Sequence, residues 1–120
     1  MKKILIIEDE SEIIELLKNR LELCDYEVVT AADGEDGFSK FLKGQPDLVI
    51  LDLSLPKISG HAVCRRIRME KEDKTPIIML TAKNGEADKI VGRLQGANKY
   101  MTKPFKPEEL LAEVKLLLNK

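Results

Sequence analysis

Ile4-Leu5-Ile6-Ile7-Glu8-Asp9, near the start of the chain, is a short apolar run that ends in charged side chains. Similar runs ending in a polar or charged residue return at Leu48–Asp52, Ile77–Thr81 and Lys99–Lys103. Runs of this length are typical of buried strands. In an open parallel sheet all strands end at one edge, where ligands bind. The sequence therefore predicts that three acids, one hydroxyl and one ammonium group meet at that edge.

Strand-like runs alternate with amphipathic stretches along the whole chain. We expect strands near residues 3–7, 26–30, 47–51, 76–80 and 98–102 and helices near 11–22, 34–43, 59–69, 86–95 and 107–118. In the first helix the apolar residues fall mostly on one face: Ile13, Ile14, Leu16, Leu17, Leu21 and Leu23. This alternation predicts an α/β fold, a doubly wound five-stranded parallel sheet with five helices on its two faces.

Length and charge narrow the function classes. The chain has 120 residues and a formal net charge of -1, so we expect one domain, 1–120, that does not itself bind nucleic acid. No apolar run approaches the ~20 residues of a membrane span. The two cysteines, Cys24 and Cys64, lack metal-site spacing. We interpret them as reduced thiols of a cytoplasmic protein.

Glu8, Asp9 and Asp52 are the acids expected at the sheet edge. Crowded carboxylates repel one another, and a bound cation relieves the repulsion. Mg²⁺ fits, since it takes hard oxygen ligands. We expect Asp9 and Asp52 to bind it directly, Glu8 directly or through water, and the carbonyl of Ser54 to add a ligand. The alternative is that Glu8-Asp9-Glu10 merely caps the first helix, which leaves Asp52 unexplained.

Asp52 also suits a nucleophile, because a carboxylate beside Mg²⁺ can attack phosphorus and form an aspartyl phosphate. Lys103 would supply a cation and Thr81 a hydroxyl for the phosphoryl oxygens. The Lys103–Pro104 bond could be cis, which would aim the lysine inward. Singly, each residue could be an ordinary polar loop residue. Jointly they favour phosphoryl chemistry.

Four segments resemble the receiver domain of two-component response regulators: Ile4–Glu10, Asp52–Gly60, Met79–Lys83 and Gly96–Phe105. The C-terminal third is most similar to receivers of winged-helix transcriptional regulators. The resemblance implies a flavodoxin-like sheet of order 2-1-3-4-5. It also implies a sensor histidine kinase as phosphoryl donor, Mg²⁺ as cofactor, and transcription regulation as one output.

The resemblance also implies roles for single residues. Glu8 and Asp9 would form the acidic pair, Asp52 the acceptor, and Thr81 and Lys103 the phosphoryl contacts. Tyr100 would be an aromatic switch that turns inward after Thr81 moves, changing the surface of the fourth helix, fifth strand and fifth helix. The alternative for Tyr100 is an ordinary aromatic residue at the sheet edge.

The same surface forms symmetric dimers in similar receivers, and here its charges differ. Lys99 and Glu113 carry signs opposite to the usual pair, whereas Lys89 and Glu109 keep the usual arrangement. We expect a homodimer that disfavours mixing with ordinary relatives. The alternative is drift on the surface of a monomeric receiver that docks to a different protein.

Three other functions compete with a phosphoacceptor switch. A hydrolase would need a second acid two residues after Asp52, where Ser54 stands. We therefore expect no enzyme beyond self-catalysed phosphotransfer and dephosphorylation. A phosphate-independent scaffold would not need the intact set of Asp9, Asp52, Thr81 and Lys103. A flavodoxin-type cofactor role would place acids where FMN phosphate binds.

Overall fold

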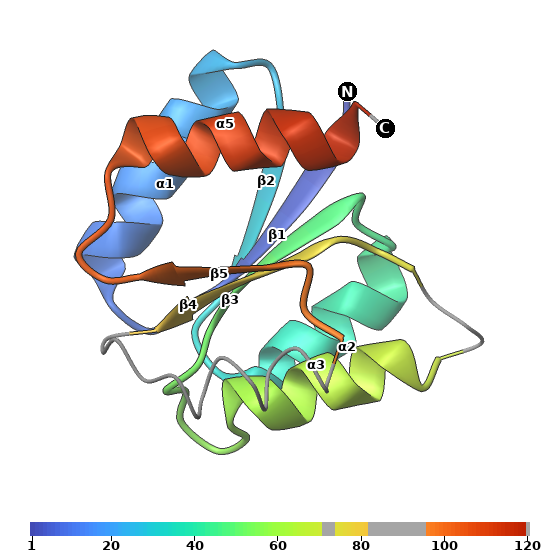
Figure 1. The fold of residues 1–120 in the computed structure, drawn as a ribbon. Helices are drawn as coiled ribbons and strands as arrows, with labels where there is room; N and C mark the ends of the chain where they lie inside the picture. Colours follow the sequence, from blue (N-terminus) through green and yellow to red (C-terminus); the bar gives the residue numbers. More distant parts are fainter. Residues whose placement is uncertain (71–73, 82–95, 120) are drawn as a thin grey trace.

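Five strands and the helices that connect them build the protein (Figure 1). The computed structural model describes residues 1–70, 74–81 and 96–119. Its elements are β1 (Lys3–Ile7), α1 (Ser11–Leu23), β2 (Glu27–Ala31), α2 (Gly34–Gly44), β3 (Leu48–Asp52), α3 (Gly60–Arg68), β4 (Ile77–Thr81), β5 (Lys99–Thr102) and α5 (Pro107–Leu118). The helix expected at 86–95, with Lys89, lies outside the described residues.

The strands form one parallel sheet in the order β2-β1-β3-β4-β5. This order confirms the expected flavodoxin-like topology. β1 and β3 lie at the centre and pair with Ile7 beside Leu51, so Glu8 and Asp52 follow at the same level. β4 pairs with β5 so that Thr81 lies beside Thr102. The register therefore brings the chemically informative strand ends together.

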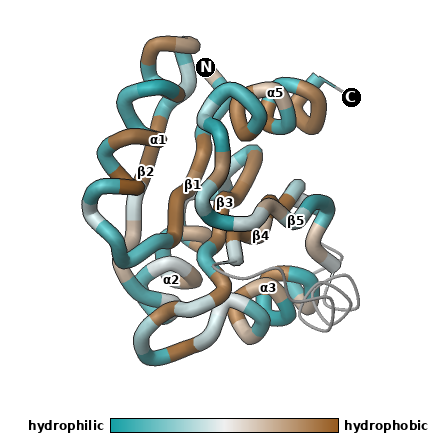
Figure 2. The backbone as a smooth tube through the Cα atoms, turned by 60° about the vertical axis from the view of Figure 1, so that its left-hand side comes forward, coloured by the Kyte–Doolittle hydropathy of each residue, from teal (hydrophilic) through white to brown (hydrophobic). Residues whose placement is uncertain are grey.

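Each face of the sheet carries two of the described helices. α1 and α5 cover one face and α2 and α3 the other (Figure 1). Successive side chains of a strand point to opposite faces, so Ile4 and Ile6 pack with α1 and α5, while Leu5 and Ile7 pack with α2 and α3. Because both faces are buried, the central strands are apolar along their length, as Figure 2 shows for β1 and β3.

Four strands, β2 to β5, begin one residue later than predicted. The residues before β3 and β5 explain two of these shifts, because the side-chain oxygen of each accepts a hydrogen bond from a neighbouring strand. Asp47 Oδ2 accepts from the backbone amide of Lys3 at 2.7 Å. Asn98 Oδ1 accepts from the amide of Ile77 at 2.9 Å. Asp52 and Thr81 are the last residues of β3 and β4.

Candidate functional site

Backbone hydrogen bonds fix the strand ends that carry the candidate residues. The amide of Glu8 donates to Ala31 O at 3.0 Å, which continues the β1–β2 pairing one residue past β1. The amide of Leu53 donates to Leu80 O at 2.8 Å and holds Asp52 against β4. The amide of Lys103 donates to Thr81 O at 2.6 Å. Lys103 and Thr81 therefore lie side by side, as the sequence analysis expects.

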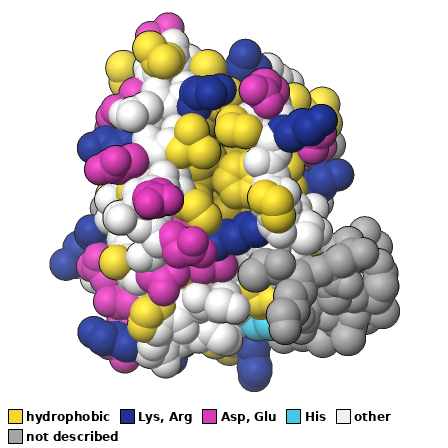
Figure 3. Space-filling model, turned by 90° about the vertical axis from the view of Figure 1, so that its left-hand side faces the viewer, with side chains coloured by type: hydrophobic (Ala, Val, Ile, Leu, Met, Phe, Trp, Pro, Cys, Tyr) yellow, Lys and Arg dark blue, Asp and Glu magenta, His cyan; other side chains and the backbone are white. Residues whose placement is uncertain are grey.

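The three acids form one cluster at this edge. Glu8, Asp9 and Asp52 each offer a carboxylate oxygen, and these oxygens lie within 4.8 Å of one another. Glu8 and Asp52 are buried, whereas Asp9 is exposed. Figure 3 looks onto this edge and shows acidic side chains gathered with basic side chains against them. Hard oxygen donors at this spacing fit a divalent cation such as Mg²⁺.

Lys103 supplies the positive charge within the cluster. Its Nζ lies 2.9 Å from Glu8 Oε1, 3.1 Å from Glu10 Oε1 and 3.5 Å from Asp52 Oδ1. The Lys103–Pro104 peptide bond is cis. Burial lowers the pKa of Lys103, but hydrogen bonds to Glu8 and Glu10 and the charge of Asp52 outweigh it and raise the pKa above its usual value. The ammonium group is therefore charged at neutral pH.

Glu10 is the residue that the sequence analysis missed. The sequence suggests only a helix-capping role for it, yet its carboxylate contacts Lys103 across 93 positions of sequence. Nothing in the local sequence distinguishes this contact from capping, because acids are common at helix N-termini for either reason.

The environment of Asp52 disfavours the ionised form of its carboxyl group. Burial raises its pKa, the charge of Glu8 raises it further, and the opposing effect of Lys103 leaves the value at about 6. The amide of Ser54 donates to Asp52 Oδ1 at 3.3 Å and also favours the charged form. The cluster thus carries more negative charge than Lys103 offsets, which supports a cation at this place.

Thr81 and Tyr100 lie on the neighbouring strands β4 and β5. Thr81 is buried at the end of β4. Tyr100 in β5 pairs in register with Met79 and packs, partly buried, against the core on the α2 and α3 side. The pairing of β4 with β5 therefore places Tyr100 two residue positions along the sheet from Thr81.

The sequence of the chain matches a known protein family over most of its length. The family model described as "Response regulator receiver domain" matches residues 4–115. The chain belongs to this family.

The chain is similar to curated transcriptional regulators. The transcriptional regulatory protein PhoP for alkaline phosphatase synthesis, from Bacillus subtilis (strain 168), is 48% identical over 119 residues, which are 99% of this chain and 49% of PhoP. This receiver domain thus spans about half the length of that relative.

Solved structures agree on the fold. Chemotaxis protein CheY4 of Vibrio cholerae superposes with a TM-score of 0.92 at 35% identity, covering 98% of this chain and 99% of CheY4. The BeF3-activated N-terminal receiver domain of Klebsiella pneumoniae RstA gives a TM-score of 0.91 at 32% identity, covering 99% of this chain and 100% of that chain.

The receiver domain's predicted interface residues lie mostly on its described surface. Lys99 Nζ contacts Glu113 Oε1 at 3.6 Å within the same chain. Glu109 is exposed in the first turn of α5. Lys89 lies outside the described residues. The exchanged charges of Lys99 and Glu113 therefore already satisfy each other inside one molecule, and their role in a dimer stays a prediction.

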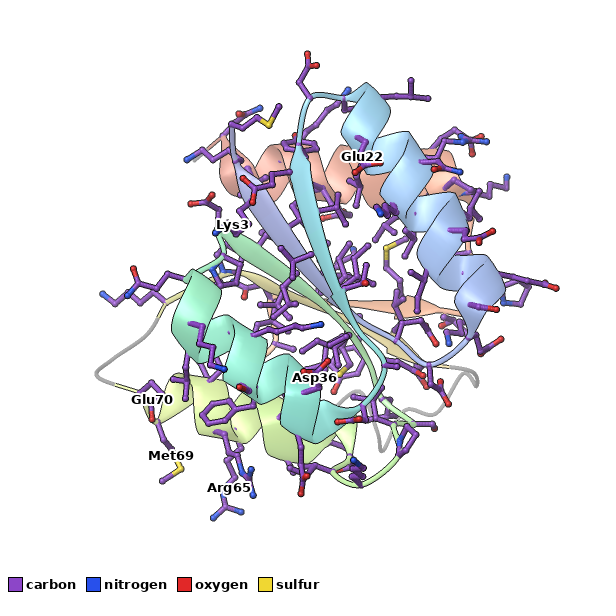
Figure 4. All side chains as sticks on the ribbon, turned by 180° about the vertical axis from the view of Figure 1, so that it is seen from behind. Lys3, Glu22, Asp36, Arg65, Met69 and Glu70 are labelled. Carbon is purple, nitrogen blue, oxygen red and sulfur yellow. The ribbon has the colours of Figure 1, made fainter. Side chains whose placement is uncertain are left out.

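A basic hollow at the opposite edge of the sheet is separate from this site. It has a volume of about 190 Å³ and is lined by Lys3, Lys40, Lys43 and apolar residues. Lys3 lies at the start of β1 (Figure 4) and donates to Gly44 O at 3.0 Å. Lys40 donates to Thr30 O at 2.6 Å. Two of the three ammonium groups are thus used by the chain's own carbonyls.

Among the described helices, none is long and apolar enough to cross a membrane.

The pKa of Asp52 leads to a prediction about stability. A carboxyl whose pKa is raised by folding stabilises the native state below about pH 4, and this contribution is lost as pH rises through about 6. Asp52→Asn removes the ionisation. At pH 7.5 without metal we expect the variant to be more stable than the wild type by about 1–3 kcal/mol, with the difference vanishing near pH 4. Urea unfolding across this pH range measures it.

Asp33→Asn is the matched control for that prediction. Asp33 caps α2 by accepting from the amide of Asp36 at 2.8 Å, and that hydrogen bond lowers its pKa. Its loss of charge should therefore change stability with the opposite sign at neutral pH. A destabilised Asp52→Asn protein at pH 7.5 would contradict the assignment of excess negative charge to the cluster.

Proposed function

We propose that Asp52 accepts a phosphoryl group from a sensor histidine kinase and thereby switches the surface of this domain. The observation that carries the proposal is the meeting of Asp52, Lys103 and Thr81 with two further acids at one sheet edge. Membership of the receiver family supports it. The function of any longer protein that contains this domain, transcription regulation included, is part of the same proposal.

In the proposed reaction a carboxylate oxygen of Asp52 attacks phosphorus. The new bond joins this oxygen to phosphorus, the bond from phosphorus to the kinase's histidine nitrogen breaks, and the imidazole keeps the electron pair. Lys103 balances the negative charge of the phosphoryl oxygens, and the Thr81 hydroxyl donates to one of them. Mg²⁺, held by Glu8, Asp9, Asp52 and the Ser54 carbonyl, would supply further charge neutralisation.

Asp52 is a phosphoacceptor here and not the nucleophile of an efficient hydrolase. Ser54 stands two residues after it, so no acid is placed there to protonate a leaving group. The proposed chemistry is self-catalysed phosphotransfer followed by self-catalysed dephosphorylation. The intact acids and lysine argue against a phosphate-independent scaffold, which would not need them.

The output would follow from the added charge. A phosphoryl group brings roughly two negative charges and strong acceptors to Asp52. Thr81 would move toward the phosphoryl group, and Tyr100 would turn into the space released. This would shift the conformation of the surface formed by the helix expected at 86–95, β5 and α5. That surface would then form a homodimer or dock to a different protein.

Intact-mass measurement after adding acetyl phosphate tests the proposal. We expect the wild type with Mg²⁺ to gain one phosphoryl group, and Asp52→Asn, or wild type with chelator, to gain none. A change in molecular size on phosphorylation would favour the homodimer, and a phosphorylated monomer would favour docking. No gain from acetyl phosphate or from a panel of sensor kinases would overturn the proposed function.

A further inference from the structure

Glu10 is tied to the site although the proposed reaction has no role for it. Glu10 is the N-cap of α1, and its carbonyl accepts from the amides of Ile13 and Ile14. An N-cap carboxylate ordinarily accepts from an amide two or three residues on. The carboxylate of Glu10 makes no such bond. Its Oε1 accepts from Lys103 Nζ instead, at 3.1 Å.

We propose that Glu10 is a positioning residue that restrains Lys103 in the unphosphorylated protein and so slows phosphorylation of Asp52. The inference rests on the proposed function and adds a regulatory element to the same site.

The geometry of the ammonium group supports a restraint. An ammonium group has three N–H donors. Glu8 at 2.9 Å and Glu10 at 3.1 Å lie within hydrogen-bond distance of Lys103 Nζ, whereas Asp52 at 3.5 Å lies beyond a good hydrogen bond. A phosphoryl group on Asp52 would draw the ammonium group toward Asp52, and this movement would lengthen the contact with at least one of its present partners.

Of the two carboxylates that contact Lys103 Nζ, Glu10 can lose this contact at the lower cost. Glu8 is fully buried, and its Oε2 accepts from the amides of Asp9 and Glu10, both at 3.1 Å. The side chain of Glu10 is 61% exposed, and Lys103 is its only partner among the described residues. Water can take over the contacts of Glu10, whereas releasing Glu8 would leave a buried charge unpaired. The Glu10 contact is thus the one that phosphorylation breaks.

Glu10→Gln removes the charge and keeps the length of the side chain, and Glu12→Gln is its matched control. Glu12 lies in the first turn of the same helix, is exposed, and has no ion pair within the described part of the chain. Both variants change the net charge equally. Exposed ion pairs are weak, so at saturating Mg²⁺ we expect Glu10→Gln to be phosphorylated by acetyl phosphate about two- to five-fold faster than Glu12→Gln. The difference should shrink at high ionic strength.

A second measurement needs neither metal nor phosphodonor. Glu10→Gln is made in the wild type and in Lys103→Met, and the urea midpoint of unfolding is measured for all four proteins. We expect Glu10→Gln to be more destabilising in the wild type than in Lys103→Met, because only in the wild type does it remove an attraction to Lys103. Such a difference would show that Glu10 and Lys103 interact in solution. A merely structural role of Glu10 at the helix end would give the same shift in both backgrounds.

The outcomes separate this inference from the proposed function. Equal phosphorylation rates for Glu10→Gln and Glu12→Gln, or equal midpoint shifts in both backgrounds, would overturn the restraint alone. A wild type that accepts no phosphoryl group would overturn the proposed function and the restraint together.

Discussion

Replacing Lys103 by methionine is expected to destabilise the protein by about 3 kcal/mol, because breaking a buried ion pair leaves one charge uncompensated. Glu8 is fully buried and depends on Lys103 Nζ at 2.9 Å. Methionine fills much of the same volume and carries no charge. Urea unfolding at pH 7.5 without metal measures the loss. Lys106→Met, an exposed lysine three residues on, is the control and should change stability little.

The rate at which Lys103→Met is phosphorylated by acetyl phosphate should also fall by about 100-fold or more. This is the usual effect of removing one preorganised electrostatic contact from a transition state. A second substitution separates the two effects. Adding Glu8→Gln removes the unpaired charge and should recover most of the stability while acceptance from acetyl phosphate stays low. A Lys103→Met protein as stable as Lys106→Met would show that Glu8 does not rely on this lysine.

Gly60→Ala is expected to destabilise the protein by about 2–3 kcal/mol, because the first residue of α3 lies directly against the end of β3. A Cβ at Gly60 would overlap the Asp52 carbonyl oxygen and lie 2.7 Å from Leu53 Cα. The amide of Gly60 donates to Leu53 O at 2.9 Å, so the helix cannot simply move away. Overpacking against backbone costs more than against a flexible side chain.

The displacement would reach the site, because the atoms in the way belong to the acceptor residue itself. We expect Gly60→Ala to weaken Mg²⁺ binding, measured by calorimetry, as well as stability. Gly44→Ala is the control: a Cβ there would meet only the end of the Lys3 side chain, at 3.8 Å. This change should be neutral or stabilising by up to about 1 kcal/mol. Equal stability of the two variants would contradict the close approach at Gly60.

The run from Asp52 to Gly60 is informative in the sequence for one reason and has a different role in the structure. In the sequence this run is part of the resemblance to receiver domains. The tertiary structure shows that its last residue is glycine because the helix begins against the carbonyl of its first. No local pattern reveals this contact, since Ser59 before it already explains the helix start by accepting from the amide of Ala62 at 3.2 Å.

Helix faces show the same limit. The apolar residues of α1 pointed to one buried face, and Leu17 and Leu21 are buried as expected. Leu16 is 38% and Leu23 82% exposed, so these two residues lie outside the buried part of the face. Periodicity gives the direction of a face, whereas the neighbouring elements decide how far around the helix burial extends.

The sequence by itself determined the sheet, its topology through the family resemblance, and which residues gather at its edge, because strand ends of a parallel sheet converge whatever the loops do. Only the tertiary structure decided the partners within that edge. Lys103 lies against Glu8 and Glu10 from 93 positions or more away, and Lys99 pairs with Glu113 inside one chain. Such pairings depend on side-chain reach and burial after the chain has closed, which no local pattern encodes.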